Sequence, residues 1–173
     1  MEIDTEVCGK LIEAAGEVDS ELVWSKTLPV GVNKRDHYSG FAEVIGIAKQ
    51  KIYDKTRRFS PNYMIASSSL LPVLGFLDGF TAAPASNING PYLAGTVDGV
   101  KVYITPNIEA GKFAIGVNGD DFMSSVAVYA PYMPVIPTQL LGYSDGGMSQ
   151  GFSTMYALEI LNPDLIVAGK IVA

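Results

Sequence analysis

Two apolar runs separated by a polar, glycine-rich loop constrain this chain most. They are Met123–Leu141 and Gly151–Leu161, and Pro131, Pro134 and Pro137 interrupt the first. Proline has no N–H and is excluded from central ladder positions, so the first run should form an edge strand or a bulged, bent one. The second run, from Phe152 onward, has no proline and can pair on both sides. The two runs predict a long, irregular hairpin-like unit without a catalytic constellation.

The composition indicates a folded chain that associates with others. The 173 residues suit one domain, and 48% hydrophobic with 17% charged residues excludes a disordered chain. This balance favours an oligomer or a fragment, because few monomers carry so much apolar surface. The formal charge of -6 argues against phosphate-directed nucleic-acid binding. We expect no internal disulfide with Cys8 alone, no membrane span and no signal peptide, hence an intracellular default.

Helical spacing of apolar residues marks two early segments. Glu2–Ala15 should end at Gly16, and 36–58 is the best helix, with Asp36 as its possible N-cap. Basic residues crowd its C-terminal half, and they favour a solvated face over an anion-binding or subunit-docking patch; they are Lys49, Lys51, Lys55, Arg57 and Arg58.

The remaining segments read mainly as strands. We expect a buried strand at 62–66, a serine-capped helical turn at 70–77, a loop at 78–91, and another strand at 112–118. Asp98-Gly99 between two β-rich runs predicts a tight hairpin of 92–97 with 100–105. Val100, Val102 and Ile104 should face one side, and the apolar runs within 162–173 should pair. The predicted fold class is α+β, with a mainly antiparallel sheet.

The sequence gives little support for a catalytic site. Ser67–Ser69 follow a strand without a nucleophile elbow, and the only histidine, His37, lies at a helix start. Asp120, Asp121 and Asp145 are the only candidate acids of an enzyme. Adjacent acids after Gly119 could bind a metal only with a third acid nearby, so a loop or cap turn is favoured. We predict no catalytic, cofactor-binding or metal site, and no enzyme.

Several segments, in order, resemble the C-terminal part of the major capsid protein of contractile-tailed bacteriophages. The most specific is 128–135, Val-Tyr-Ala-Pro-Tyr-Met-Pro-Val; the others are 1–7, 38–57 with 62–67, 100–104 and 151–156. Met155 stands where the family tends to have arginine. The resemblance implies the Hong Kong 97 type capsid fold. Because the family's proteins are much longer, it also implies that an N-terminal arm, an extended loop and most of a long helix precede Met1, in a shortened or partial chain.

The resemblance implies a structural subunit of a phage or prophage shell. Copies would form hexamers and pentamers that enclose DNA, with scaffold, protease and portal proteins as further partners. No membrane and no specific nucleic-acid site are implied. The location would be the virion, after assembly in the bacterial host cytoplasm. The implied parts are 1–58, helices of the junction; 59–129, the axial domain; and 130–173, crossover and return strands of the peripheral domain, in one compact unit.

Two other readings stay open from the residues alone. A small α+β module could bind a ligand or peptide through the glycine-rich loops 81–90 and 142–151. An enzyme would depend on the three acids named above.

Overall fold

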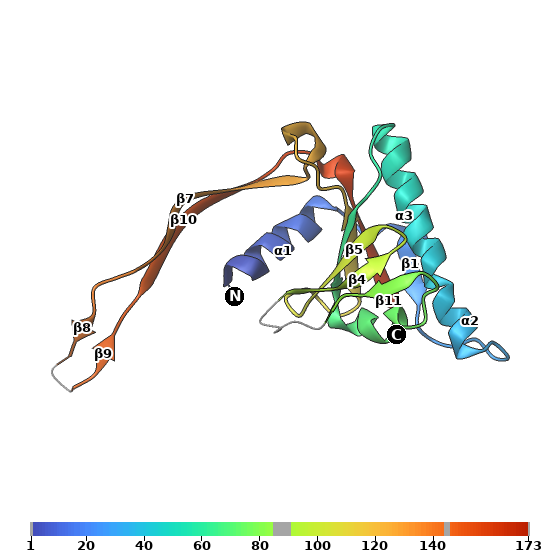
Figure 1. Ribbon diagram of the computed structural model, residues 1–173, viewed down its shortest axis with the longest axis horizontal. Helices are drawn as coiled ribbons and strands as arrows, with labels where there is room; N and C mark the ends of the chain where they lie inside the picture. Colours follow the sequence, from blue (N-terminus) through green and yellow to red (C-terminus); the bar gives the residue numbers. More distant parts are fainter. Residues whose placement is uncertain (1, 85–90, 144–145, 173) are drawn as a thin grey trace.

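The computed structural model describes residues 2–84, 91–143 and 146–172. A seven-stranded sheet carries helices on both faces, and a long two-stranded arm leaves it (Figure 1). The helices are α1 (Glu2–Ala14), α2 (Lys34–Ser39), α3 (Phe41–Thr56) and α4 (Leu71–Leu74), with 3-10 turns η1 (Ser20–Leu22), η2 (Ser68–Leu70), η3 (Phe122–Ser124) and η4 (Pro163–Leu165). The strands are β1 (Val23–Ser25), β2 (Tyr63–Ser67), β3 (Phe80–Ala82), β4 (Tyr92–Val97), β5 (Val100–Thr105), β6 (Lys112–Gly116), β7 (Ala127–Pro137), β8 (Leu141–Gly142), β9 (Met148–Ser149), β10 (Phe152–Ile160) and β11 (Ile166–Val172).

The sheet has the strand order β1-β11-β6-β2-β5-β4-β3. Its pairs are antiparallel except β1 with β11 and β2 with β5. The predicted α+β class with a mainly antiparallel sheet is confirmed. β11 confirms that the C-terminal apolar runs pair, and it lies between β1 and β6 in the sheet. The expected division at residue 130 grouped it with the return strands, yet its hydrogen-bonded neighbours come from residues 23–25 and 112–116.

The core lies between the sheet and α3. Alternation along β2 and β5 points Met64 and Val102 toward this side, where they are fully buried with Phe41 and Ile52 of α3. The aromatic rings of Phe41 and Phe113 meet edge to face at 5.5 Å between centroids. The other face of the sheet is turned toward α1 (Figure 1).

The hairpin of β4 and β5 is confirmed at its predicted turn. Asp98 and Gly99 have φ values of 47° and 80°, and Val97 pairs with Val100. Both turn positions need the left-handed region, which Gly and Asp tolerate better than most residues. Val100, Val102 and Ile104 face the core together, as expected.

Two helices replace the single one expected at 36–58. The break falls at Gly40, and Asn33, rather than Asp36, caps α2 by accepting from the Arg35 N–H at 3.4 Å. Gly40 keeps a right-handed conformation, so the two helices continue along nearly one course. The apolar period runs through the break, and it therefore could not reveal it.

The serine run has a role other than the expected cap. The Ser67 and Ser69 hydroxyls both accept from the Gly111 N–H, at 3.0 and 3.1 Å, and neither side chain caps the following turn. These bonds tie the end of β2 to the loop before β6. The expected loop 78–91 also contains a strand, β3, which pairs with β4 at the sheet edge.

Candidate assembly surfaces

The arm consists of β7 and β10, which pair antiparallel from Ala127↔Ile160 to Pro137↔Phe152. It projects away from the sheet, with β8 and β9 paired near its tip (Figure 1). The predicted long hairpin is therefore confirmed. Part of the expected 142–151 loop forms these tip strands, whereas positions 144 and 145 lie outside the described residues.

Large apolar side chains cover the arm without burying one another. Tyr132, Met148 and Phe152 are 87%, 76% and 71% exposed. Charges are nearly absent from this stretch of sequence, which has only Asp145 and Glu159 between 127 and 160. Exposed large hydrophobic residues on the arm are Tyr129, Tyr132, Val135, Ile136, Leu140, Leu141, Tyr143, Met148, Phe152 and Met155. An arm with many exposed apolar side chains and few charges is typical of an interaction site.

Two prolines of β7, Pro131 and Pro137, lie where they cost the arm no ladder bond. The Leu161 N–H donates to the Val126 carbonyl at 2.9 Å, and the Thr138 N–H donates to the Gly151 carbonyl at 2.7 Å. Because bonded and non-bonded pairs alternate in an antiparallel ladder, the nitrogens of Pro131 and Pro137 point outward. The outer edge of β7 therefore lacks N–H donors at these two positions.

The two edges of the arm consequently differ. Register shifts between Ser153 and Tyr156 place the extra residues on β7, so β7 is the bulged strand and β10 the regular one. β10 contains no proline, and in the described part of the chain β7 is its only strand partner. The bulged edge strand confirms the reading of the proline-rich run. The outer edge of β10 retains its N–H donors.

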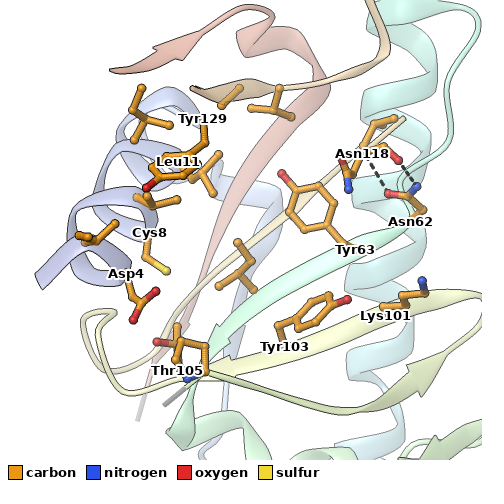
Figure 2. Close-up of a pocket in the computed structure, with 18 of the residues that line it drawn as sticks. Asp4, Cys8, Leu11, Asn62, Tyr63, Lys101, Tyr103, Thr105, Asn118 and Tyr129 are labelled. Atoms are coloured by element: carbon orange, nitrogen blue, oxygen red, sulfur yellow. Dashed lines mark hydrogen bonds between the residues drawn. The ribbon is translucent and has the colours of Figure 1, made fainter. Parts of the chain in front are cut away.

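A groove of about 870 Å³ lies between α1, the root of the arm and the sheet face opposite the core. Figure 2 shows Asp4, Cys8 and Leu11 of α1 facing Tyr63 and Tyr103 of the sheet, with Tyr129 of the arm above. Further groove residues are Ile3, Val7, Asn62, Ile65, Pro91, Gly99, Lys101, Thr105, Val117, Asn118, Asp120, Val126, Ala127 and Leu158.

Polar groups in the groove are held by the protein itself. The Asn62 amide donates to the Asn118 carbonyl at 2.6 Å and accepts from the Asn118 N–H at 2.8 Å (Figure 2). Burial raises the pKa of Tyr63 to about 12, so its phenol stays neutral. Burial, with a smaller effect of Asp4, also raises the pKa of the Cys8 thiol and lowers its reactivity.

Asp120 and Asp121 belong to the turn before the arm. The Asp121 N–H donates to Ser124 Oγ at 3.2 Å, and Ser125 Oγ donates to the Gly119 carbonyl at 3.0 Å. This confirms the reading of a loop or cap turn that leads into η3. Within the described ranges, no three His, Cys, Asp or Glu side chains are grouped to hold a metal. Asp145 lies outside the described residues.

The basic residues of α3 divide into two sets, which neither sequence reading anticipated. Lys49 forms an ion pair with Asp98 in the β4–β5 turn, and Lys51 bridges Asp19 and Glu21, the latter at 2.8 Å. These contacts fasten α3 to the sheet and to η1. Lys55, Arg57 and Arg58 form no ion pair in the part of the chain that the structure describes.

A protein-family model described as "Major capsid protein Gp23" matches residues 1–171. The chain belongs to the Gp23 major capsid protein family. The resemblance stated from sequence is thereby confirmed. Its most specific segment, 128–135, lies on β7, and Met155 is exposed on β10.

Solved structures show that this Gp23 family member has the Hong Kong 97 type fold. A virus-like particle from Pyrococcus furiosus matches with a TM-score of 0.58 and 15% identity, over 98% of this chain and 62% of that chain. The mature capsid of bacteriophage PhiM1 matches with a TM-score of 0.54 and 16% identity, over 98% of this chain and 60% of that chain. An encapsulin complex from Synechococcus elongatus PCC 7942 matches with a TM-score of 0.52 and 15% identity, over 97% of this chain and 61% of that chain.

The Gp23-type chain thus spans about three fifths of the length of these structures. A sequence search of curated proteins gives no match. No helix in the described ranges has both the length and the apolar character needed to cross a membrane.

Sequence reasoning missed the groove, which is formed by α1, β2, β5 and the arm, elements far apart in sequence. It did anticipate a difference between the two strands of the arm, because prolines at 131, 134 and 137 occur in only one of the two runs.

Proposed function

We propose that this chain is a structural subunit of a bacteriophage or prophage capsid shell. Copies self-assemble into hexamers and pentamers that enclose DNA. The observation that carries the proposal is the arm, a projecting hairpin with exposed Tyr132, Met148 and Phe152 and few charges. Surface of this kind becomes stable in water when other subunits cover it. Family membership supplies the partner, since a major capsid protein meets copies of itself.

The proposed parts follow the chain as expected from the resemblance, with one addition. Residues 59–129 form the axial domain, and β11 joins them because it pairs with β6. Residues 1–58 supply the helices of the junction, and the rest of 130–173 supplies the crossover and the return strand of the peripheral domain. The role of the whole subunit is mechanical rather than catalytic. Scaffold, protease and portal proteins complete the set of partners, and assembly takes place in the bacterial host cytoplasm before the subunit resides in the virion.

The test compares two triple variants of the same chain. In the arm variant, serine replaces Tyr132, Met148 and Phe152. In the matched control, serine replaces Leu28, Val30 and Val32. Those three control side chains are also exposed, but they lie in the loop before α2. With the changes made in the full-length subunit, sedimentation velocity and negative-stain microscopy should show rings or particles for the wild type and the control.

The arm variant should remain folded by circular dichroism and sediment as a monomer. Particles formed by the arm variant would overturn the proposal, and so would a full-length subunit that stays monomeric with its scaffold and protease partners present.

A further inference from the structure

Two oppositely charged surfaces at one end of the molecule remain unassigned by the shell function. The first is the acidic turn, defined as residues 119–125 with Asp164. The second is the basic end of α3, defined as Tyr53, Lys55, Arg57 and Arg58. Figure 1 shows η3 and the C-terminal end of α3 as separate projections at the same end of the molecule.

The acidic turn presents two large apolar side chains on a fixed backbone. Phe122 and Met123 are 67% and 69% exposed. Around them the Gly119 N–H donates to the Ser124 carbonyl at 3.0 Å, and the Asn162 amide donates to the Met123 carbonyl at 3.2 Å. Exposed apolar groups held rigidly lose little conformational entropy on binding, which suits them to a contact surface.

Carboxylates lie next to this apolar pair in sequence and in the neighbouring 3-10 turn η4. Asp120 and Asp121 directly precede Phe122, and all three side chains are exposed. Asp164 is exposed in η4, two residues after the Asn162 that bonds to Met123. The turn therefore combines an apolar centre with negative charge around it.

The basic end of α3 has complementary chemistry. Lys55, Arg57 and Arg58 are exposed, and Tyr53 beside them is an exposed aromatic. The Arg58 guanidinium lies over the Phe59 ring at 5.3 Å from its centroid. Asp54 is the one acid within the same helical turn, so positive charge predominates. Lys49 and Lys51, by contrast, are already bound to the acids of their own chain.

We infer that the acidic turn of one copy docks on the basic end of α3 of a second copy. This inference rests on the proposed shell function and names one contact within it. Phe122 and Met123 would lie against Tyr53, with Asp120 and Asp164 facing Lys55 and Arg58. A contact between two different surfaces can repeat head to tail from copy to copy, and heterologous contacts of this kind close subunits into rings. Opposite charge on the two surfaces sets partner orientation as well as affinity.

A charge-reversal series tests the contact in the whole chain. Lys55→Glu with Arg58→Glu should weaken self-association about tenfold or more, and adding Asp120→Lys with Asp164→Lys should restore it. The control, Lys26→Glu with Lys101→Glu, makes the same change in net charge at lysines that form no ion pair in the described part of the chain. Sedimentation velocity over a concentration series measures association, and thermal melting checks folding.

A zero-length carbodiimide cross-link provides the second measurement. In an equal mixture of unlabelled and ¹⁵N-labelled wild-type chains, mixed-isotope peptides joining Lys55 to Asp120, Asp121 or Asp164 are expected. Wild-type-like association of the Lys55/Arg58 variant, or failure of the four-residue reversal to restore it, would overturn the inference. If the arm variant abolishes association while the Lys55/Arg58 variant associates like the wild type, the shell function stands and this contact fails.

Discussion

The Tyr156 hydroxyl on the arm donates a hydrogen bond to the Glu6 carboxylate on α1. These residues lie 150 positions apart, and the bond connects the two elements that cover the groove. Glu6 also lies 3.8 Å from the Lys10 ammonium, one helical turn further along. The root of the arm is therefore oriented by α1 as well as by its own strand ladder.

Removal of the Tyr156 hydroxyl should loosen this connection without unfolding the chain. For Tyr156→Phe we expect a loss of less than about 1 kcal/mol in the free energy of unfolding, because both groups are exposed to water. Hydrogen exchange measured by mass spectrometry should rise in α1 and in the root of β10. Tyr132→Phe, further along the arm, is the control. Unchanged exchange in α1 would show that the bond does not orient the arm.

The ion pair of Asp19 with Lys51 should make stability depend on pH. The hydrogen bond from Lys51 lowers the pKa of Asp19 below its ordinary value of 3.8. A lowered folded-state pKa stabilises the protein above the unfolded-state pKa, and this contribution is lost as the pH falls through the folded value. Asp19→Asn should therefore cost up to about 1 kcal/mol near neutral pH, given the partial exposure of the pair.

The same comparison in acid provides the control for Asp19. Urea unfolding well below pH 3.8 should give nearly equal stabilities for wild type and variant, because Asp19 is then protonated. A stability difference that persists undiminished in acid would contradict an origin in the charged pair.

The outward prolines of β7 should protect the arm against edge-to-edge growth. Pro131→Ala with Pro137→Ala adds two outward N–H donors while leaving the β7–β10 ladder intact. We expect faster, concentration-dependent aggregation with increased thioflavin T fluorescence. Pro163→Ala, in η4, is the matched control. A double variant no more prone to aggregation than this control would contradict a protective role.

Position 169 of β11 should tolerate only glycine, because Phe113 and the Leu22 carbonyl lie close to its Cα. A Cβ there would overlap the Phe113 ring and come within 2.8 Å of the Leu22 carbonyl oxygen. Gly169→Ala should cost about 1–3 kcal/mol in the free energy of unfolding, the range for overpacked cores. Gly46→Ala, in α3, meets nothing within 4 Å and should stabilise by roughly 0.5–1 kcal/mol. Urea titration of both variants tests the contrast, and a neutral Gly169→Ala would contradict it.

Local signals predicted the local parts of this fold. Asp98-Gly99 located the β4–β5 hairpin because only a few residues accept its turn, and three prolines identified the bulged strand. Asp36 was wrong as a cap because the helix is capped by Asn33, three positions earlier. Periodicity also missed the break at Gly40, since α2 and α3 continue one apolar stripe.

Long-range pairing was beyond such signals. Nothing near Trp24 indicates that β1 pairs parallel with Ile171 and its neighbours. The groove likewise depends on contacts between α1 and the arm, such as Glu6 with Tyr156. The exposed apolar surface was foreseen from composition, but its concentration on β7 and β10 required the geometry of the hairpin.

The position of β11 has a consequence for synthesis. The sheet needs this strand between β1 and β6, but the ribosome makes it after the whole arm. A nascent chain released before residue 166 would leave the β6 edge open and Leu22 and Phe113 without much of their cover, and it should be degraded rather than assembled. The order of translation thus works as quality control, because a chain that completes its sheet has necessarily already made its arm.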